Sequence, residues 1–144
     1  MSTNTIQLPN EKYAPFCCTW HNQHNSEMDL MIHSDGWLTG TFRTEAGEEF
    51  PLVGFVAGDV IGFSVSFGKH HCVTCWNGHM NADGNLDTLW QMSIDVGDQE
   101  DCLWKSTFSG ADLYTKGPKA AKLHLLKTAP SHPTWLASEK RNSS

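Results

Sequence analysis

Short apolar and aromatic runs, broken about every ten residues by Gly, Asp or Asn, dominate the 144-residue sequence. The run Val60–Phe67 shows the pattern most clearly, because Phe63, Val65 and Phe67 alternate with serines. Apolar side chains at every second position lie on one face of a β-strand. A helix would need a period of about 3.6 residues, and no segment shows that period convincingly. The pattern therefore predicts antiparallel strands joined by tight turns.

The spacing of the turns predicts eight strands. Their expected ranges are Cys17–Asn22, Glu27–His33, Trp37–Arg43, Phe50–Ala57, Val60–Phe67, Cys72–Asn81, Leu86–Val96 and Cys102–Gly110. Eight antiparallel strands in simple succession favour an all-β, up-and-down barrel, because closure of the sheet removes its exposed edges.

Charge divides the chain into an acidic body and a basic end. Residues 1–116 hold five Lys/Arg and fifteen Asp/Glu, whereas residues 117–144 hold five and one. We expect an N-terminal extension over 1–16, one barrel domain over 17–116 and a basic, flexible tail thereafter. The formal charge of −6 argues against nucleic-acid binding. No apolar run reaches the ~20 residues of a membrane-spanning helix, so we expect no membrane association.

The cysteines do not indicate a set of structural disulfides, because their number is odd and two are adjacent. They stand at positions 17, 18, 72, 75 and 102. The polar segment Met1–Asn10 lacks the charged and apolar regions of a signal peptide. Both features favour a cytoplasmic protein, although a secreted protein whose signal had been removed would show them too.

Alternation places aromatic rings and hydroxyls together on the inner face of the barrel. The inward set on one strand contains Cys72, Thr74 and Trp76, and the next strand contributes Trp90 and Met92. An eight-stranded barrel either fills itself with side chains or holds one small ligand. Hydroxyl groups beside tryptophan rings favour a ligand cavity.

The sequence offers little for catalysis. No nucleophile lies in a recognisable elbow and no glycine-rich loop leads into a helix, so we expect a non-enzymatic protein. A metal site at His70, His71 and Cys75 stays open as an alternative. Structural zinc sites usually need four ligands, however, and Cys72 and Cys75 point to opposite faces of their strand.

Six motifs, in order along the chain, resemble the avidin/streptavidin family of biotin-binding proteins. They are Thr19–Gln23, Leu38–Phe42, Thr74–Gly78, Thr88–Trp90, Trp104–Thr107 and Gly110–Lys116. The resemblance covers roughly residues 18–116. It implies non-catalytic, high-affinity binding of biotin in the barrel cavity, without a cofactor. It also implies a homodimer or homotetramer, and the presence of Trp104 favours the tetramer.

The resemblance assigns a ligand contact to individual residues. Asn22 and Ser26 match the residues that hold biotin's ureido oxygen, whereas Asp112 and Thr44 match acceptors for the ureido nitrogens. Thr74 matches the residue that meets the ligand sulfur. This polar set is chemically coherent, because a cyclic urea presents one acceptor and two donors, and an ionised carboxyl only accepts.

The rest of the implied site is apolar. Trp76 and Trp90 match tryptophans that enclose the ligand rings, with Met92 on the same inner face. Trp104 matches a tryptophan that a neighbouring subunit lends across an interface. Cys72 stands at the mouth, near the expected position of the ligand carboxylate.

Some residues depart from the family pattern. Phe42 replaces a tyrosine that donates to the ureido oxygen, which should cost about 1–3 kcal/mol of binding free energy. Phe67 replaces a tryptophan, His24 an aliphatic residue and Cys72 a hydroxyl. Glu48 would add a negative charge near the ligand carboxylate. These changes predict weaker biotin binding than in the tightest members of the family.

Three other interpretations stay open. A lipocalin-like or fatty-acid-binding barrel would hold an apolar ligand, but would lack the motifs around Trp104 and Asp112. A relative whose pocket has drifted would take another small ligand or serve an interaction role, which the changes at Phe42 and Phe67 allow. The metal-dependent protein described above is the third, and metal analysis of the purified protein would test it.

If the missing hydroxyl at Phe42 weakens binding, the substitution Phe42→Tyr should tighten biotin binding by about the free energy of one buried hydrogen bond. Titration calorimetry on the two proteins measures this difference. An unchanged affinity would remove the missing hydroxyl as the explanation.

Overall fold

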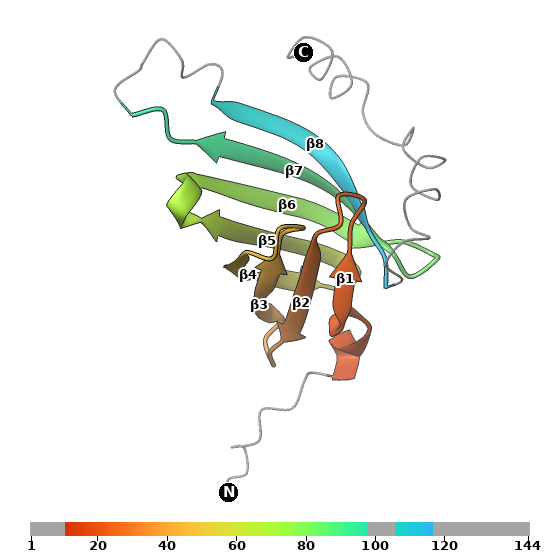
Figure 1. Cartoon of the computed structure of the whole chain (residues 1–144). Coiled ribbons are helices and arrows are strands. Elements are labelled where there is room, and N and C mark those ends of the chain that lie inside the picture. Colours follow the sequence, from red (N-terminus) through yellow and green to blue (C-terminus); the bar gives the residue numbers. More distant parts are fainter. Residues whose placement is uncertain (1–10, 98–105, 117–144) are drawn as a thin grey trace, which may run out of the picture.

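Eight antiparallel strands form one sheet that curls into a barrel in the computed structural model, which describes residues 11–97 and 106–116 (Figure 1). The strands are β1 (Thr19–His21), β2 (Glu27–Ile32), β3 (Trp37–Arg43), β4 (Glu49–Ala57), β5 (Val60–Phe67), β6 (Cys72–Met80), β7 (Leu86–Ile94) and β8 (Thr107–Tyr114). Each strand pairs with the next along the chain. The predicted all-β, up-and-down architecture is confirmed.

The first and last strands meet at His21 and Thr115. The backbone N–H of His21 donates to the Thr115 carbonyl at 2.8 Å, and the Thr115 N–H donates to the His21 carbonyl at 2.9 Å. Because this bridge joins β1 to β8, residues that follow β1 in the sequence come to lie against the last inward residues of β8. The candidate site is built at this junction.

The inner face follows the predicted alternation. Phe63 and Val65 on β5 and Thr74 and Trp76 on β6 are buried, whereas the intervening Cys75 is exposed. The register pairs these residues across the sheet, with Phe63 opposite Trp76 and Val65 opposite Thr74. The core is therefore one continuous layer of inward side chains.

Within the described part of the chain, two short 3-10 helices were not predicted from the sequence. They are η2 (Glu11–Phe16) and η3 (Gly68–His70). Phe16 at the end of η2 is buried in the core, and its carbonyl accepts a hydrogen bond from Trp20 Nε1 at 3.0 Å. Among the described residues, no helix is both long and apolar enough to cross a membrane.

The last strand differs from the prediction. The sequence placed it at Cys102–Gly110, but β8 begins at Thr107 and continues to Tyr114. Residues 98–105, which include Cys102, lie outside the described part of the chain. Gly110, Asp112 and Tyr114 are all buried on β8, and Leu113 between the last two is buried as well. Gly110 and Asp112 are not apolar residues, so the alternation of apolar residues did not predict the end of this strand.

Candidate functional site

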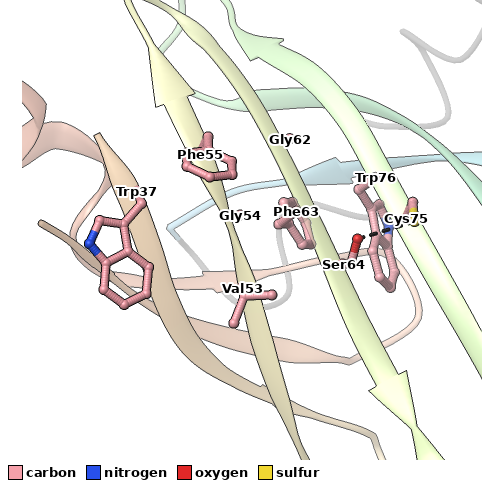
Figure 2. Close-up of a pocket in the computed structure, with 9 residues that line it drawn as sticks. All are labelled: Trp37, Val53, Gly54, Phe55, Gly62, Phe63, Ser64, Cys75 and Trp76. Atoms are coloured by element: carbon pink, nitrogen blue, oxygen red, sulfur yellow. Dashed lines mark hydrogen bonds between the residues drawn. The ribbon is translucent and has the colours of Figure 1, made fainter. Parts of the chain in front are cut away.

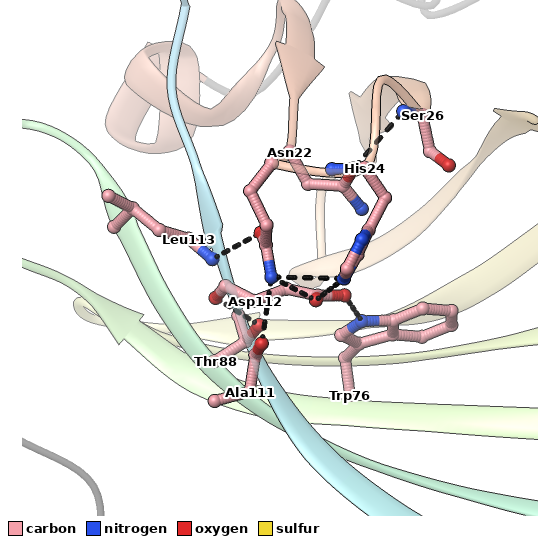
Figure 3. Close-up of polar contacts among 9 residues, drawn as sticks. Asn22, His24, Ser26, Trp76, Thr88, Ala111, Asp112 and Leu113 are labelled. Atoms are coloured by element: carbon pink, nitrogen blue, oxygen red, sulfur yellow. Dashed lines mark hydrogen bonds and ion pairs between the residues drawn. The ribbon is translucent and has the colours of Figure 1, made fainter. Parts of the chain in front are cut away.

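The Asp112 carboxylate lies at the centre of a polar cluster on the inner face of β8 (Figure 3). Its side chain is only 4% exposed. Trp76 Nε1 donates a hydrogen bond to Asp112 Oδ2 at 2.8 Å, and Gln23 Nε2 donates to Oδ1 at 2.8 Å. Thr88 Oγ1 donates to the Asp112 backbone carbonyl at 2.8 Å, which fixes this part of β8 against β7.

Burial raises the pKa of Asp112 above its usual value of 3.8. Hydrogen bonds from Trp76 and Gln23, together with the nearby His24, oppose this shift by favouring the charged form. His24 Nε2 lies 3.6 Å from Asp112 Oδ1. When ionised, the carboxylate can accept further hydrogen bonds, because its two oxygens have about four lone-pair directions. The group is suited to accept from a ligand N–H.

Gln23 is a site residue that sequence reasoning missed. Besides donating to Asp112, its Nε2 donates to the Ala111 carbonyl at 3.0 Å, and its Oε1 accepts from the Leu113 N–H at 3.2 Å. The side-chain amide therefore pairs with the β8 backbone as a further strand residue would. Gln23 belongs to the Thr19–Gln23 motif, so the signal was present, but no local pattern shows that it reaches a residue 89 positions away.

Asn22 lies in the turn that joins β1 to β2 and is buried. Its Oδ1 accepts hydrogen bonds from the backbone N–H groups of His24, at 2.9 Å, and Ser26, at 3.1 Å. The Asn22 N–H also donates to the Ser26 carbonyl at 3.0 Å, and Asn25 takes a left-handed φ of 64° within the turn. With its oxygen held in this way, the amide presents Nδ2 as a donor.

Aromatic rings form the apolar part of the site. Trp76 stacks on Phe63 with a centroid distance of 5.0 Å and lies 5.3 Å from Phe42. Phe42 in turn meets Phe67 edge-on at 5.7 Å. These four rings come from β3, β5 and β6, so the two departures at Phe42 and Phe67 lie in the same wall as Trp76.

Trp90 lies against β8 because position 110 is glycine. A Cβ added to Gly110 would lie 2.5 Å from Trp90 Cζ2, which is too close for any rotamer to relieve cheaply. The half-buried Trp90 ring therefore depends on the bare backbone at Gly110. Both residues belong to motifs that the sequence analysis singled out, but their contact follows from the pairing of Trp90 with Gly110 across β7 and β8.

The loop after β3 carries Glu48, for which the sequence analysis predicted no partner of opposite charge. Glu48 forms ion pairs with Lys69 and with His70, whose Nε2 lies 3.1 Å from Glu48 Oε1. These two partners lower the pKa of Glu48. The expectation of an isolated negative charge near the ligand carboxylate therefore has to be revised, because Glu48 lies beside two basic side chains. Thr44 lies in the same loop, and its Oγ1 accepts a hydrogen bond from the Glu48 backbone N–H at 3.2 Å.

The structure brings most of the predicted site residues to one inner surface, but not all. Asn22, Phe42, Thr74, Trp76 and Asp112 are buried, and Ser26, Phe67, Trp90 and Met92 are half-buried. Thr44 and Cys72 belong to loops and strand ends at the Glu48 side. Burial raises the pKa of the Cys72 thiol. Trp104 lies outside the described residues.

The metal alternative has no support in the described part of the chain. No group of three His, Cys, Asp or Glu side chains there lies close enough to hold an ion. His70 is directed to Glu48 instead, and Cys75 Sγ lies 3.1 Å from Ser64 Oγ.

The sequence of the chain also matches a known protein family. The model of the avidin family matches residues 11–117, which is most of the chain. The chain belongs to the avidin family. The resemblance inferred from the six motifs is thereby confirmed, and the match begins at Glu11, the first residue of η2.

Solved structures of avidin-family proteins share the fold. A crystal structure of xenavidin is 25% identical in sequence with a TM-score of 0.61, over 69% of this chain and 95% of the xenavidin chain. A crystal structure of apo shwanavidin is 25% identical with a TM-score of 0.58, over 68% and 92% of the two chains. A rhizavidin–biotin complex has the same fold at 24% identity, with a TM-score of 0.57 over 67% and 88%.

The raised pKa of Asp112 predicts how the stability of this avidin-family protein depends on pH. The unfolded carboxyl ionises near 3.8, but the folded one ionises at higher pH, so the folded state binds the extra proton. The free energy of unfolding of the wild type, relative to that of Asp112→Asn, should therefore fall as pH rises from 3.8 through the folded pKa. Above that pKa the difference should stay constant.

Urea unfolding of the ligand-free proteins between pH 3 and 8 would measure this difference. The variant serves as the reference because all other carboxyls, including Glu48 with its lowered pKa, titrate in both proteins. A difference that rises with pH would contradict the assignment of burial as the dominant effect on Asp112.

Proposed function

We propose that this chain binds biotin without catalysis, in the barrel interior lined by Asp112, Asn22 and the rings around Trp76. The observation that carries the proposal is a buried carboxylate that accepts a hydrogen bond from the Trp76 ring, together with a second buried polar group, the Asn22 amide, in the turn whose residue Gln23 also bonds Asp112. The cyclic urea of biotin needs acceptors for two N–H groups and donors for one carbonyl oxygen. Family membership supports the same ligand.

The polar groups are held in place before the ligand arrives. Asn22 Oδ1 is fixed by two backbone donors, and Asp112 by Trp76 and Gln23. Little conformational freedom is then lost on binding, which is how a small ligand gains affinity in a preformed site. No step of this function makes or breaks a covalent bond.

The Glu48 side of the site suits the ligand carboxylate better than the sequence indicated. Lys69 and His70 pair with Glu48 there, so the cluster does not present an isolated negative charge. Phe42 and Phe67 still offer fewer contacts than tyrosine and tryptophan would. We therefore expect the affinity to be limited by the aromatic wall rather than by charge at the mouth.

Calorimetric titration of ligand-free, folded protein should show one biotin bound per chain. Asp112→Asn should weaken binding about 10- to 100-fold, because the anionic acceptor for the ureido N–H groups becomes a neutral amide. The control Asp83→Asn changes an exposed turn residue in the same chemical way and should leave the affinity unchanged.

Desthiobiotin, which keeps the cyclic urea, should bind the wild type more weakly and should lose affinity similarly in Asp112→Asn. No heat with biotin, from protein shown to be folded and free of ligand, would refute this function. It would leave a family member whose pocket has drifted to another ligand or to an interaction role.

We further propose that the subunits assemble through the outer face of the barrel. Trp37, Val53 and Phe55 are 43%, 54% and 68% exposed and surround a hollow of about 490 Å³ over β3 to β6 (Figure 2). Gly54 and Gly62 also line it. A contiguous apolar surface of this kind is typical of an interface. The expected assembly is a homotetramer in which Trp104 reaches a neighbouring pocket.

Sedimentation velocity should then give a mass about four times that of the 16.0 kDa chain. Phe55→Glu should shift the protein toward smaller species, since a charge would be buried in the interface. Ala82→Glu, in an exposed turn, is the control and should not change the mass. A wild-type protein that sediments as a monomer would refute the assembly.

A further inference from the structure

Tyr114 carries a buried hydroxyl that the site described above does not use. The residue follows Asp112 by two positions on β8, and its side chain has no solvent exposure. Its ring packs against Phe63 at a centroid distance of 6.2 Å and an interplanar angle of 70°. Among the described residues, Tyr114 Oη has no hydrogen-bond partner of normal geometry.

A buried hydroxyl without a partner is unfavourable, because it loses its hydrogen bonds to water and gains none in return. Phenylalanine would fill the same space without this penalty. Retaining the hydroxyl therefore needs a reason, and a ligand that completes its hydrogen bond supplies one.

The surroundings of the hydroxyl define what it can bind. Burial, and then the charge of Asp112, raise the pKa of Tyr114 well above its usual value near 10. The Asn22 side chain opposes the shift because it lies within hydrogen-bonding reach of the hydroxyl, although not in the geometry of a formed bond. Tyr114 is thus protonated at neutral pH and lies near both polar groups of the site. Because Asn22 Oδ1 already accepts two hydrogen bonds, Asn22 and Tyr114 both offer donors to this space.

We propose that Tyr114 Oη donates a hydrogen bond to the carbonyl oxygen of the ligand's cyclic urea, and so replaces the hydroxyl missing at Phe42. Two neutral donors beside the Asp112 carboxylate favour a neutral acceptor over an anionic one, which Asp112 would repel. The inference rests on the proposed biotin function, because it identifies which atom of the urea this residue meets.

The positions of Phe42 and Tyr114 are linked through one aromatic surface. Phe42 lies 5.3 Å from Trp76, Trp76 stacks on Phe63 at 5.0 Å, and Phe63 meets Tyr114. Trp76 also donates to Asp112. Phe42 on β3 and Tyr114 on β8 therefore belong to one continuous group of interior aromatic rings.

The test compares Tyr114→Phe with wild type for two ligands, biotin and the diamine left when the urea carbonyl of biotin is removed. Biotin binding should weaken about tenfold, whereas the affinity for the diamine should not change. The ligand-free variant should be as stable as the wild type or more so in urea. Tyr13→Phe changes the other tyrosine of the chain, outside this surface, and should leave both affinities unaltered.

The outcomes separate the inference from the function. If the wild type binds biotin and Tyr114→Phe binds it equally well, the inference is wrong and the function stands. Equal losses for biotin and the diamine, or a less stable ligand-free variant, would show that the hydroxyl serves the fold. If the wild type binds no biotin, both are wrong.

A second variant tests the replacement of one hydroxyl by the other. Phe42→Tyr should tighten biotin binding more in the Tyr114→Phe background than in the wild type, where Tyr114 already supplies a donor. An equal gain in both backgrounds would overturn the replacement, because each hydroxyl would then act on its own atom.

Discussion

The rest of the site depends on the burial of one carboxylate, that of Asp112. A charge removed from water requires donors around it, and Trp76 and Gln23 supply them from β6 and from the turn after β1. Its backbone is fixed in turn by Thr88. The same group thus ties together strands from both ends of the chain, and its two oxygens can accept further hydrogen bonds.

The residues that match the family pattern and those that depart from it lie in different parts of the candidate site. The amide of Asn22 and the carboxylate of Asp112 match the family pattern. Glu48, which the sequence suggested as a lone negative charge, is paired with Lys69 and His70. The aromatic wall is where this chain departs most, at Phe42 and Phe67, which pack against each other. A hydroxyl at Tyr114 lies on the opposite strand of the same interior. In the binding mode proposed above, β3 and β8 are therefore the strands that determine how the carbonyl oxygen of the urea is held.

Much of the fold could be predicted from the sequence, because strand alternation is a local property. The inward positions of Phe63, Thr74 and Trp76 followed from their spacing alone. The end of β8 could not be predicted, because its inward residues Gly110 and Asp112 carry no apolar signal. Gln23 was missed for a related reason, since its partners on β8 are far away in the sequence.

The sequence by itself determined the number of strands, their order, most of the inner face and the family, since each of these is encoded in a period of two or in a short motif. Only the tertiary structure decided which polar groups meet. The pairing of His21 with Thr115 brings Gln23 and His24 to Asp112, and Lys69 and His70 meet Glu48. It also leaves the Tyr114 hydroxyl, within the described part of the chain, without a hydrogen bond of normal geometry. These contacts join distant segments, so no local period records them, and the free energy of the closed barrel selects them.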